Sequence, residues 1–275
     1  MAYNPVDLVV VSAWGKTVGA LAQDPRTGFF AFEYDPSWIR TRIELSPFHV
    51  RNSPGVFVFP QLSEPTYRRL PAMLADALPD QFGTSLLEAY LAGLGVASHQ
   101  ITSLDRLAYM GRRGMGALEF APPIGRNESS GTAFDLAQIV AQGRNAIAGS
   151  FGTEADATAG VRELIQIGSS AGGLRAKAII AWNADTGEVR GGHVAPDPGF
   201  EPWIIKLDGV EAASEVGATI GHGRVEYAYF LMASAAGVAM SRSRLLEEGG
   251  RAHFMTHRFD RAGTGKIHTQ TLCAR

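Results

Sequence analysis

The stretch Gly168-Ser-Ser-Ala-Gly-Gly-Leu-Arg-Ala-Lys177, followed by Ala178-Ile-Ile-Ala-Trp182, restricts the fold more than any other part of the sequence. Residues 177–182 are rich in β-branched and aromatic side chains, and Asn183-Ala-Asp-Thr-Gly187 after them is typical of a hairpin turn. The segment Glu163-Leu-Ile-Gln-Ile167 before the glycines also has the composition of a strand. The glycine-rich segment is therefore predicted to be a loop between two strands.

Two familiar uses of such a loop fit this sequence poorly. Gly168 and Gly173 have the spacing of a Walker A phosphate loop, but the next residues are Leu174 and Arg175, where that motif needs Lys and then Ser or Thr. The loop also matches the G-x-S-x-G motif of serine hydrolases, with Ser170 as nucleophile, but that motif lies between a strand and a helix. The Walker A loop is excluded. A hydrolase stays a minor alternative, because histidines that follow in the sequence offer a base.

A third use is a glycine-rich hairpin that covers nucleotide phosphates, as in protein kinases, because backbone N–H groups of small residues approach phosphate oxygens closely. This use requires a lysine on a neighbouring strand, an acidic residue on the next helix, and then a strand leading to the adenine-binding hinge. Lys206 ends a strand-like run, and Glu226 lies in a predicted helix over residues 224–236. Residues 253–259 form a later strand-like run. This order is that of a kinase N-lobe.

Each of these signals also has a plainer interpretation. Glycines often make only a turn, a lysine such as Lys206 at a strand end is usually solvated, and Glu226 taken alone is most simply a surface charge. His222 and Glu226 lie four residues apart on one helix face, but no third ligand accompanies them, so no metal site is predicted there. The kinase interpretation therefore depends on the signals occurring together in the right order.

The composition limits the class of protein. The chain has 275 residues, enough for one large domain or two small ones. Its 25 Lys and Arg residues are balanced by 27 Asp and Glu residues. The chain therefore lacks the excess of basic residues that is the simplest evidence for a general nucleic-acid binder. Cys273 is the only cysteine, which excludes an internal disulfide and multi-cysteine zinc sites. Because neither a signal-peptide pattern nor a membrane-length apolar run occurs, we expect a cytoplasmic protein.

The chain divides into two parts at a polar segment rich in Gly, Ser and Asn, near residues 122–132. Before it, a helical pattern over residues 66–93 is interrupted near Pro79, and a second glycine cluster spans residues 111–116. The further predicted elements are strands over residues 6–13, 17–22, 28–34, 55–59, 117–121, 202–206, 243–246 and 267–272, a helix over residues 133–149 and a hairpin turn over residues 263–266. The fold class is α+β, with a β-rich N-terminal part and a kinase-like sheet with one helix.

Four longer motifs resemble those of the HipA family of toxin–antitoxin serine/threonine kinases. Two lie in the first half, Leu74-Ala-Asp-Ala-Leu-Pro-Asp-Gln-Phe-Gly83 and Asp105-Arg-Leu-Ala-Tyr-Met-Gly-Arg-Arg-Gly-Met-Gly-Ala-Leu-Glu-Phe120. Two lie in the second half, where residues 168–177 look like the family's phosphate loop and His253-Phe-Met-Thr-His-Arg-Phe-Asp-Arg261 looks like its hinge. The resemblance covers essentially the whole chain.

The resemblance implies a HipA-like N-terminal domain of residues 1–124 and a kinase-like N-lobe of residues 125–275. It also implies that the chain binds ATP. Ser170 matches a loop serine that family members can autophosphorylate, and Glu226 is expected to form a structural ion pair. The residues expected to contact ATP are Gly172, Gly173, Lys177 and Lys206, with His257, Arg258 and Phe259 at the hinge around adenine.

The sequence departs from the family at His257, where relatives often have an acidic residue, but a hinge works through backbone groups. A second departure is more serious. Phosphoryl transfer needs an Asp, an Asn and a second Asp that holds Mg²⁺, and in the family these come from a C-lobe beyond the hinge. Here only residues 261–275 follow Asp260, which itself lies on the hinge side. We therefore expect no catalytic residue and no Mg²⁺ site in this chain, an absent C-lobe, and little phosphotransfer by the chain alone.

The resemblance also implies the partners. These are a small DNA-binding antitoxin similar to HipB and a protein substrate, for which family precedent suggests an aminoacyl-tRNA synthetase. Direct contact with nucleic acid or a membrane is not expected. The alternative from a different functional class is a non-catalytic module that binds the antitoxin or a nucleotide without chemistry.

Overall fold

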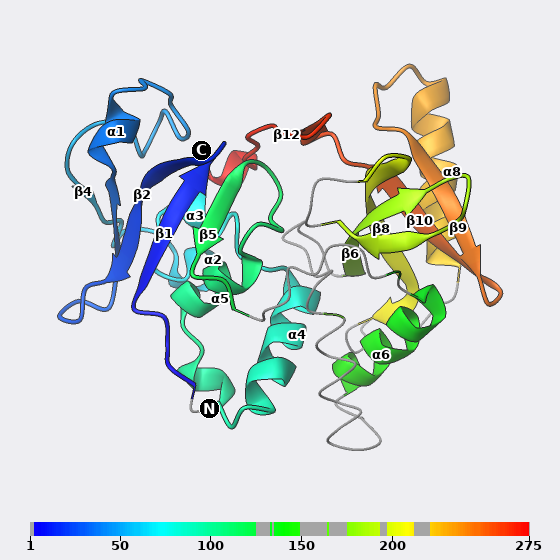
Figure 1. The fold of residues 1–275 in the computed structure, drawn as a ribbon, viewed down its shortest axis with the longest axis horizontal. Coiled ribbons are helices and arrows are strands. Elements are labelled where there is room, and N and C mark those ends of the chain that lie inside the picture. The colour runs from blue at the N-terminus through cyan, green and yellow to red at the C-terminus, as the bar shows by residue number, and fades with distance from the viewer. Residues whose placement is uncertain are drawn as a thin grey trace.

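The computed structural model describes residues 3–124, 133, 135–148, 164, 175–192, 197–211 and 221–274. In these residues the chain forms two five-stranded antiparallel sheets that lie on opposite sides of the molecule (Figure 1). The first sheet has the order β4 (Val56–Phe57), β3 (Phe30–Tyr34), β2 (Lys16–Gln23), β1 (Leu8–Ala13) and β5 (Leu118–Ala121). The second has the order β7 (Val189–Gly191), β6 (Arg175–Asn183), β8 (Phe200–Glu211), β10 (Arg251–His257) and β9 (Ser243–Glu248).

The strand predictions in the first part of the chain are confirmed, because alternating burial follows the sequence pattern. In β1 the side chains of Val9, Val11 and Ala13 are buried, and the residues between them are more open. Short helices cover this part: α1 (Pro36–Ile39), the 3₁₀ turn η1 (Ser98–Gln100) and α5 (Ser103–Met110). Helix α5 was not predicted. It begins with a capping box between Thr102 and Asp105.

The predicted long helix over residues 66–93 is three separate helices, α2 (Glu64–Tyr67), α3 (Ala72–Ala75) and α4 (Gln81–Ala92). The chain leaves the helical path because Arg68 and Arg69 adopt left-handed backbone angles, with φ of 50° and 63°. Pro71 then restricts the residue before it and precedes α3. Only the expected break near Pro79 is confirmed.

The second sheet confirms most of the predicted order. The runs over residues 177–182, 202–206 and 243–246 lie in β6, β8 and β9, and the predicted helices appear as α6 (Leu136–Ala148) and α8 (His222–Ala235). β10 ends at His257, two residues before the predicted end. A continuous hydrophobic core joins the two sheets, with Phe82 of α4 and Ile139 of α6 among its members. The result is a mixed fold with antiparallel sheets and few helices.

One predicted strand is wrong, and most of another lies outside the described residues. Of residues 163–167, the structure describes only Leu164, which is helical, so the strand predicted over this run stays a prediction at its other positions. Residues 267–272 do not pair with any described strand, and Leu272 begins a 3₁₀ turn, η2 (Leu272–Ala274). The reason is that this tail hydrogen bonds to the first domain instead. The backbone amide of Thr271 donates to Asp76 at 2.8 Å.

The tail reaches the first domain through a small hairpin, β11 (Arg261–Ala262) and β12 (Gly265–Lys266), which confirms the predicted turn over residues 263–266. Figure 1 shows this hairpin bridging the space between the sheets, with the C-terminal end beside the first sheet. The position of the domain boundary stays a prediction, since residues 125–132 lie outside the described residues. In the part of the chain that the structure describes, no helix combines the length and the apolar character needed to cross a membrane.

Candidate functional site

The second sheet places two lysines opposite each other. Lys177 of β6 pairs with Lys206 of β8 in the antiparallel register, so both side chains point to the same face of the sheet. Burial, together with the charge of Lys206, lowers the pKa of Lys177. A separate carboxylate holds each lysine: Asp80 contacts Lys177, and Glu226 contacts Lys206. The arrangement concentrates cationic groups at one place on the sheet.

The pair between Lys206 and Glu226 joins β8 to helix α8. The ammonium of Lys206 contacts Oε2 of Glu226, and Nη1 of Arg175 lies 3.2 Å from Oε1 of the same carboxylate. Lys206 Nζ also lies 5.6 Å from the centroid of the Phe254 ring on β10. The Lys206 side chain is 30% exposed, so its charge is held in place and still open to a ligand. A lysine and an arginine arranged in this way can bind a phosphate group.

A glycine allows α8 to approach the sheet closely enough for this pair. A Cβ atom at Gly223 would lie 1.8 Å from the carbonyl oxygen of Ala252, so a larger residue would push the helix away. Asp208 of β8 fixes the start of the helix, because both its carboxylate oxygens accept from the amide of Gly221 at 3.0 Å. The amide of Asp208 donates to Nδ1 of His253 at 2.9 Å. Burial lowers the pKa of His253 to about 4, which keeps this imidazole neutral.

Lys177, which was predicted to contact nucleotide, lies in a buried ion pair with the first domain. Its Nζ is 3.4 Å from Oδ2 of Asp80, and the two side chains are 5% and 1% exposed. Asp80 also caps helix α4, since its other carboxylate oxygen accepts from the amide of Gly83 at 2.8 Å. Lys177 donates in addition to the carbonyl of Arg175 at 2.9 Å. A contact between Lys177 and nucleotide stays a prediction.

The three predicted hinge residues end and follow β10. The amide of His257 donates to the carbonyl of Arg242 at 2.8 Å, and the amide of Arg258 donates to the carbonyl of Pro202 at 3.0 Å. These two backbone donors are therefore used within the protein. Phe259 is 62% exposed. The adenine-binding role of these residues stays a prediction, and Arg258 and Phe259 lie outside the strand in which they were expected.

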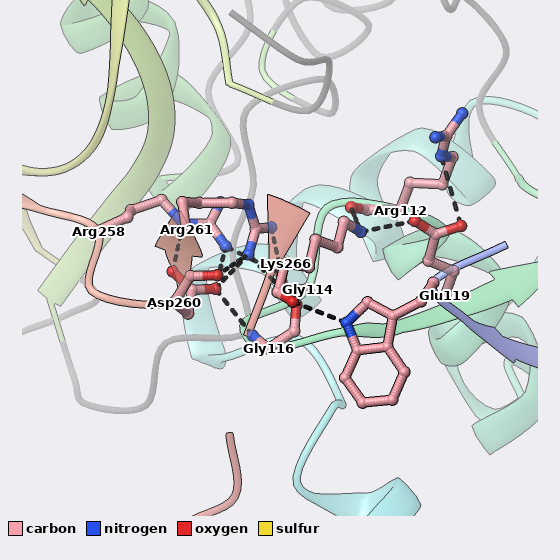
Figure 2. A network of polar contacts seen from close by, with 9 residues as sticks. Arg112, Gly114, Gly116, Glu119, Arg258, Asp260, Arg261 and Lys266 are labelled. Atoms are coloured by element: carbon pink, nitrogen blue, oxygen red, sulfur yellow. Dashed lines mark hydrogen bonds and ion pairs between the residues drawn. The ribbon is translucent and has the colours of Figure 1, made fainter. Parts of the chain in front are cut away.

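The side chain of Arg258 is buried in a charged network between the two domains (Figure 2). Its Nε and Nη2 contact the two oxygens of Asp260 at 2.9 and 2.6 Å, and Nη2 also donates to the carbonyl of Gly114 at 3.1 Å. The amide of Gly116 donates to Asp260 at 2.8 Å, and Arg261 reaches the same carboxylate. Burial alone would raise the pKa of Asp260, but Arg258 and Arg261 outweigh burial and hold the pKa below its usual range.

Next to this network, Lys266 of β12 adds a second link to the first domain (Figure 2). Its ammonium lies 2.9 Å from Glu119 and donates to the carbonyl of Arg112 at 3.0 Å. The indole of Trp14 donates to the carbonyl of Lys266 at 2.7 Å. The second glycine cluster, residues 111–116, thus has a structural role, because its backbone groups hydrogen bond to residues that follow β10.

The remaining predicted positions, Ser170, Gly172 and Gly173, lie outside the described residues, and their roles stay predictions. The hydrolase alternative at Ser170 is likewise untested. Sequence reasoning missed Asp80 and Asp208. A signal existed for Asp80, because an aspartate directly before a helical run is a typical N-cap. For Asp208 we find no such signal, since its partners come from other elements.

Comparison with protein families gives two matches. A family described as the HipA N-terminal domain matches residues 9–121, and a family described as the HipA-like C-terminal domain matches residues 169–275. The second match assigns the residues predicted as an N-lobe to a HipA-like C-terminal domain. The absence of a further lobe stays a prediction. No curated protein matches the chain.

Comparison with solved structures agrees with the family matches. The fold is similar to a chain in the complex of HipA, HipB and operator DNA from the toxin–antitoxin system of Shewanella oneidensis MR-1, with a TM-score of 0.57 and 15% sequence identity. The match covers 95% of this chain and 54% of the solved one, so this chain spans about half the length of that relative. The two family matches together take in most of the sequence, and the chain belongs to the HipA family.

Proposed function

We propose that the second sheet binds ATP and that the chain is part of a HipA-like protein kinase. Such a kinase transfers a phosphoryl group from ATP to a Ser or Thr of a protein. The observation that carries this proposal is the ion pair between Lys206 of β8 and Glu226 of α8. In protein kinases a strand lysine and a glutamate of the following helix form such a pair, and it must be in place for activity. The order β6, β8, α8, β9 and β10 also supports the proposal.

The described residues fit a nucleotide phosphate. Glu226 holds the ammonium of Lys206 and thereby orients its N–H donors, while Arg175 shares the same carboxylate and limits its excess negative charge. When bound, ATP supplies the phosphoryl group and Mg²⁺ neutralises charge between the phosphates. Asp260 is not proposed as a catalytic base or a Mg²⁺ ligand, because Arg258 and Arg261 enclose its carboxylate.

The partners are proposed from the family. The solved relative was determined together with HipB and its operator DNA. By this likeness we propose a HipB-like antitoxin as partner, with the contacts to DNA made by the antitoxin. The proposed substrate is a protein, with an aminoacyl-tRNA synthetase as the family expectation, and Ser170 is proposed as an autophosphorylation site.

The test is the affinity for MgATP, measured by isothermal titration calorimetry on the wild-type chain and on Lys206→Ala. A hydrogen bond to a charged group contributes about 1.5–3 kcal/mol, so Lys206→Ala should weaken binding about tenfold or more. Lys16→Ala is the matched control, since Lys16 is exposed on β2 of the first sheet and should leave the affinity unchanged.

The alternative is a non-catalytic module that contacts the antitoxin or a nucleotide without chemistry. One observation favours it: the amides of His257 and Arg258, at the predicted hinge, already donate to carbonyls of the protein. Under this alternative the affinity for MgATP is weak and does not change in Lys206→Ala. A clear loss of affinity in Lys206→Ala, with the control unaffected, would decide for the nucleotide site.

A further inference from the structure

Two buried carboxylates connect the second sheet to the first domain, and they do so on both sides of the strand that carries Lys206. We propose that Asp80 and Asp260 are positioning residues, through which the first domain fixes strands β6 and β10 and thereby sets the affinity of the sheet for nucleotide. This inference rests on the proposed function, because it assigns a role toward the same nucleotide site.

The first connection acts on β6. Asp80 is immobilised by its own helix, since it accepts from the amide of Gly83 at 2.8 Å and caps α4. Its second oxygen lies 3.4 Å from Nζ of Lys177, and both side chains are buried. A lysine on β6 is therefore held by a group that belongs to the first domain. Because Lys177 is the cross-strand partner of Lys206, a change in its position alters the charge next to Lys206.

The second connection acts on the end of β10. Asp260 is fully buried and accepts from the amide of Gly116, which precedes it by 144 residues. Arg258 donates hydrogen bonds to both carboxylate oxygens of Asp260 and also to the carbonyl of Gly114. Arg261 adds contacts of 3.3 Å and 3.4 Å to the carbonyls of Gly116 and Gly114. The segment that leaves β10 is thereby fastened to the backbone of the first domain.

The sheet order explains why these two connections matter together. β8 lies between β6 and β10, and it hydrogen bonds to both. The strand that carries Lys206 is thus flanked by two strands, each anchored to the first domain by a buried carboxylate. If either anchor is lost, a flanking strand can shift, and Lys206 and Glu226 then spend less time in the arrangement that binds phosphate.

A purely structural role for these carboxylates makes a different prediction. Buried ion pairs are often weak contributors to stability, and breaking one lowers the stability of the fold without changing how the folded protein binds its ligand. A positioning role lowers the affinity of the folded protein, because only a fraction of the molecules have the competent arrangement. Affinity and local mobility, measured on folded variants, separate the two.

The experiment compares Asp80→Asn and Asp260→Asn with the matched control Asp76→Asn. Asp76 also links the C-terminal tail to the first domain, by accepting from the amide and the hydroxyl of Thr271, but it contacts neither β6 nor β10. MgATP affinity is measured by calorimetry, and hydrogen exchange is measured at the amides of residues 204–207 on β8. We expect both test variants to bind about tenfold more weakly, as for a competent fraction of about one tenth. Exchange on β8 should be faster in both, with the control like wild type.

Wild-type affinity and wild-type exchange in folded Asp80→Asn and Asp260→Asn would overturn the inference. If Asp260→Asn does not fold, Arg261→Lys replaces it, because it keeps the charge and removes the planar fork that reaches Gly114 and Gly116. If the wild-type chain does not bind MgATP, the proposed function fails. The part of the inference that concerns affinity then fails with it, and the exchange tests only whether the first domain restrains β8. Exchange that becomes faster on β8 but not on β2 of the same variant supports that restraint, and exchange that is unchanged on β8, or faster on both strands, overturns it.

Discussion

Asp80 and Lys177 form a buried ion pair although 97 residues separate them in the sequence. Burial raises the pKa of Asp80 to about 6, because removing a carboxylate from water costs more than the nearby ammonium of Lys177 and the amide of Gly83 recover. The pair therefore connects the two domains at a cost in stability that depends on pH.

The first prediction concerns the pH dependence of this cost. Between about pH 4 and 6 the folded protein keeps a proton on Asp80 that the unfolded chain has released. The free energy of unfolding of the wild type, relative to Asp80→Asn, should therefore fall as the pH rises through this window, by at most about 3 kcal/mol. Urea unfolding of both proteins at several pH values measures this. Parallel pH profiles would contradict the prediction.

The second prediction concerns His253, whose buried imidazole works in the opposite direction. Its pKa falls to about 4 in the folded protein, so the unfolded chain takes up the proton first as the pH falls from about 6.5 to 4. Stability should decrease with falling pH in this window. His253→Asn should remove that contribution, because asparagine does not titrate there, and it retains an acceptor for the Asp208 amide. His49→Asn, at an exposed position, should keep the wild-type profile in the same urea experiment.

The third prediction concerns the glycine under helix α8. In Gly223→Ala the new methyl group meets the carbonyl of Ala252, so the helix must move or the strand must bend. Overpacking of this kind costs about 1–3 kcal/mol or more. We expect that loss in thermal or urea unfolding, together with weaker MgATP binding because Glu226 moves away from Lys206. Gly93→Ala, where the nearest atom is 3.4 Å away, should have little effect.

The fourth prediction tests whether Glu226 has a specific role that another carboxylate near α8 lacks. Glu226→Gln removes the charge that holds Lys206, and we expect about tenfold weaker MgATP binding with a small change in stability, because the pair is partly exposed. Glu247→Gln breaks an exposed pair with Arg224 on the same helix, at 3.0 Å, and serves as the control. Equal effects of the two variants on calorimetric affinity would argue against a specific role for Glu226.

The order of elements in the second half could be predicted from the sequence, because strand and helix patterns are local. The positions of Lys206 and Glu226 follow from that order, since a strand and the next helix pack together and bring their facing side chains into contact. The tail shows the limit of this reasoning. Residues 267–272 contain β-branched Ile and Thr residues, as strands often do, but the amide of Thr271 donates to Asp76 of the first domain. The local pattern does not contain that information.

The contacts between the domains could not be predicted for the same reason. Asp80 and Lys177 are far apart in the sequence, and the group of the first domain that donates to Asp260 is the backbone amide of Gly116, which every residue except proline has. Arg258 was predicted at the hinge because of its position in a motif, and that role stays a prediction. The motif did not reveal that the guanidinium of Arg258 pairs with the carboxylate of Asp260, which a buried arginine needs as a partner charge.

The return of the C-terminal tail to the first domain has a consequence for how the chain is held together. The polypeptide leaves the first domain after β5, builds the second sheet and then comes back, so that His268 contacts Leu45 and Thr271 contacts Asp76. The chain therefore crosses between the two halves twice, once between β5 and β6 and once after β10. A single proteolytic cut between β5 and β6 would leave one crossing covalently intact, and the fragment that contains the second sheet would stay attached to the first domain through its own tail.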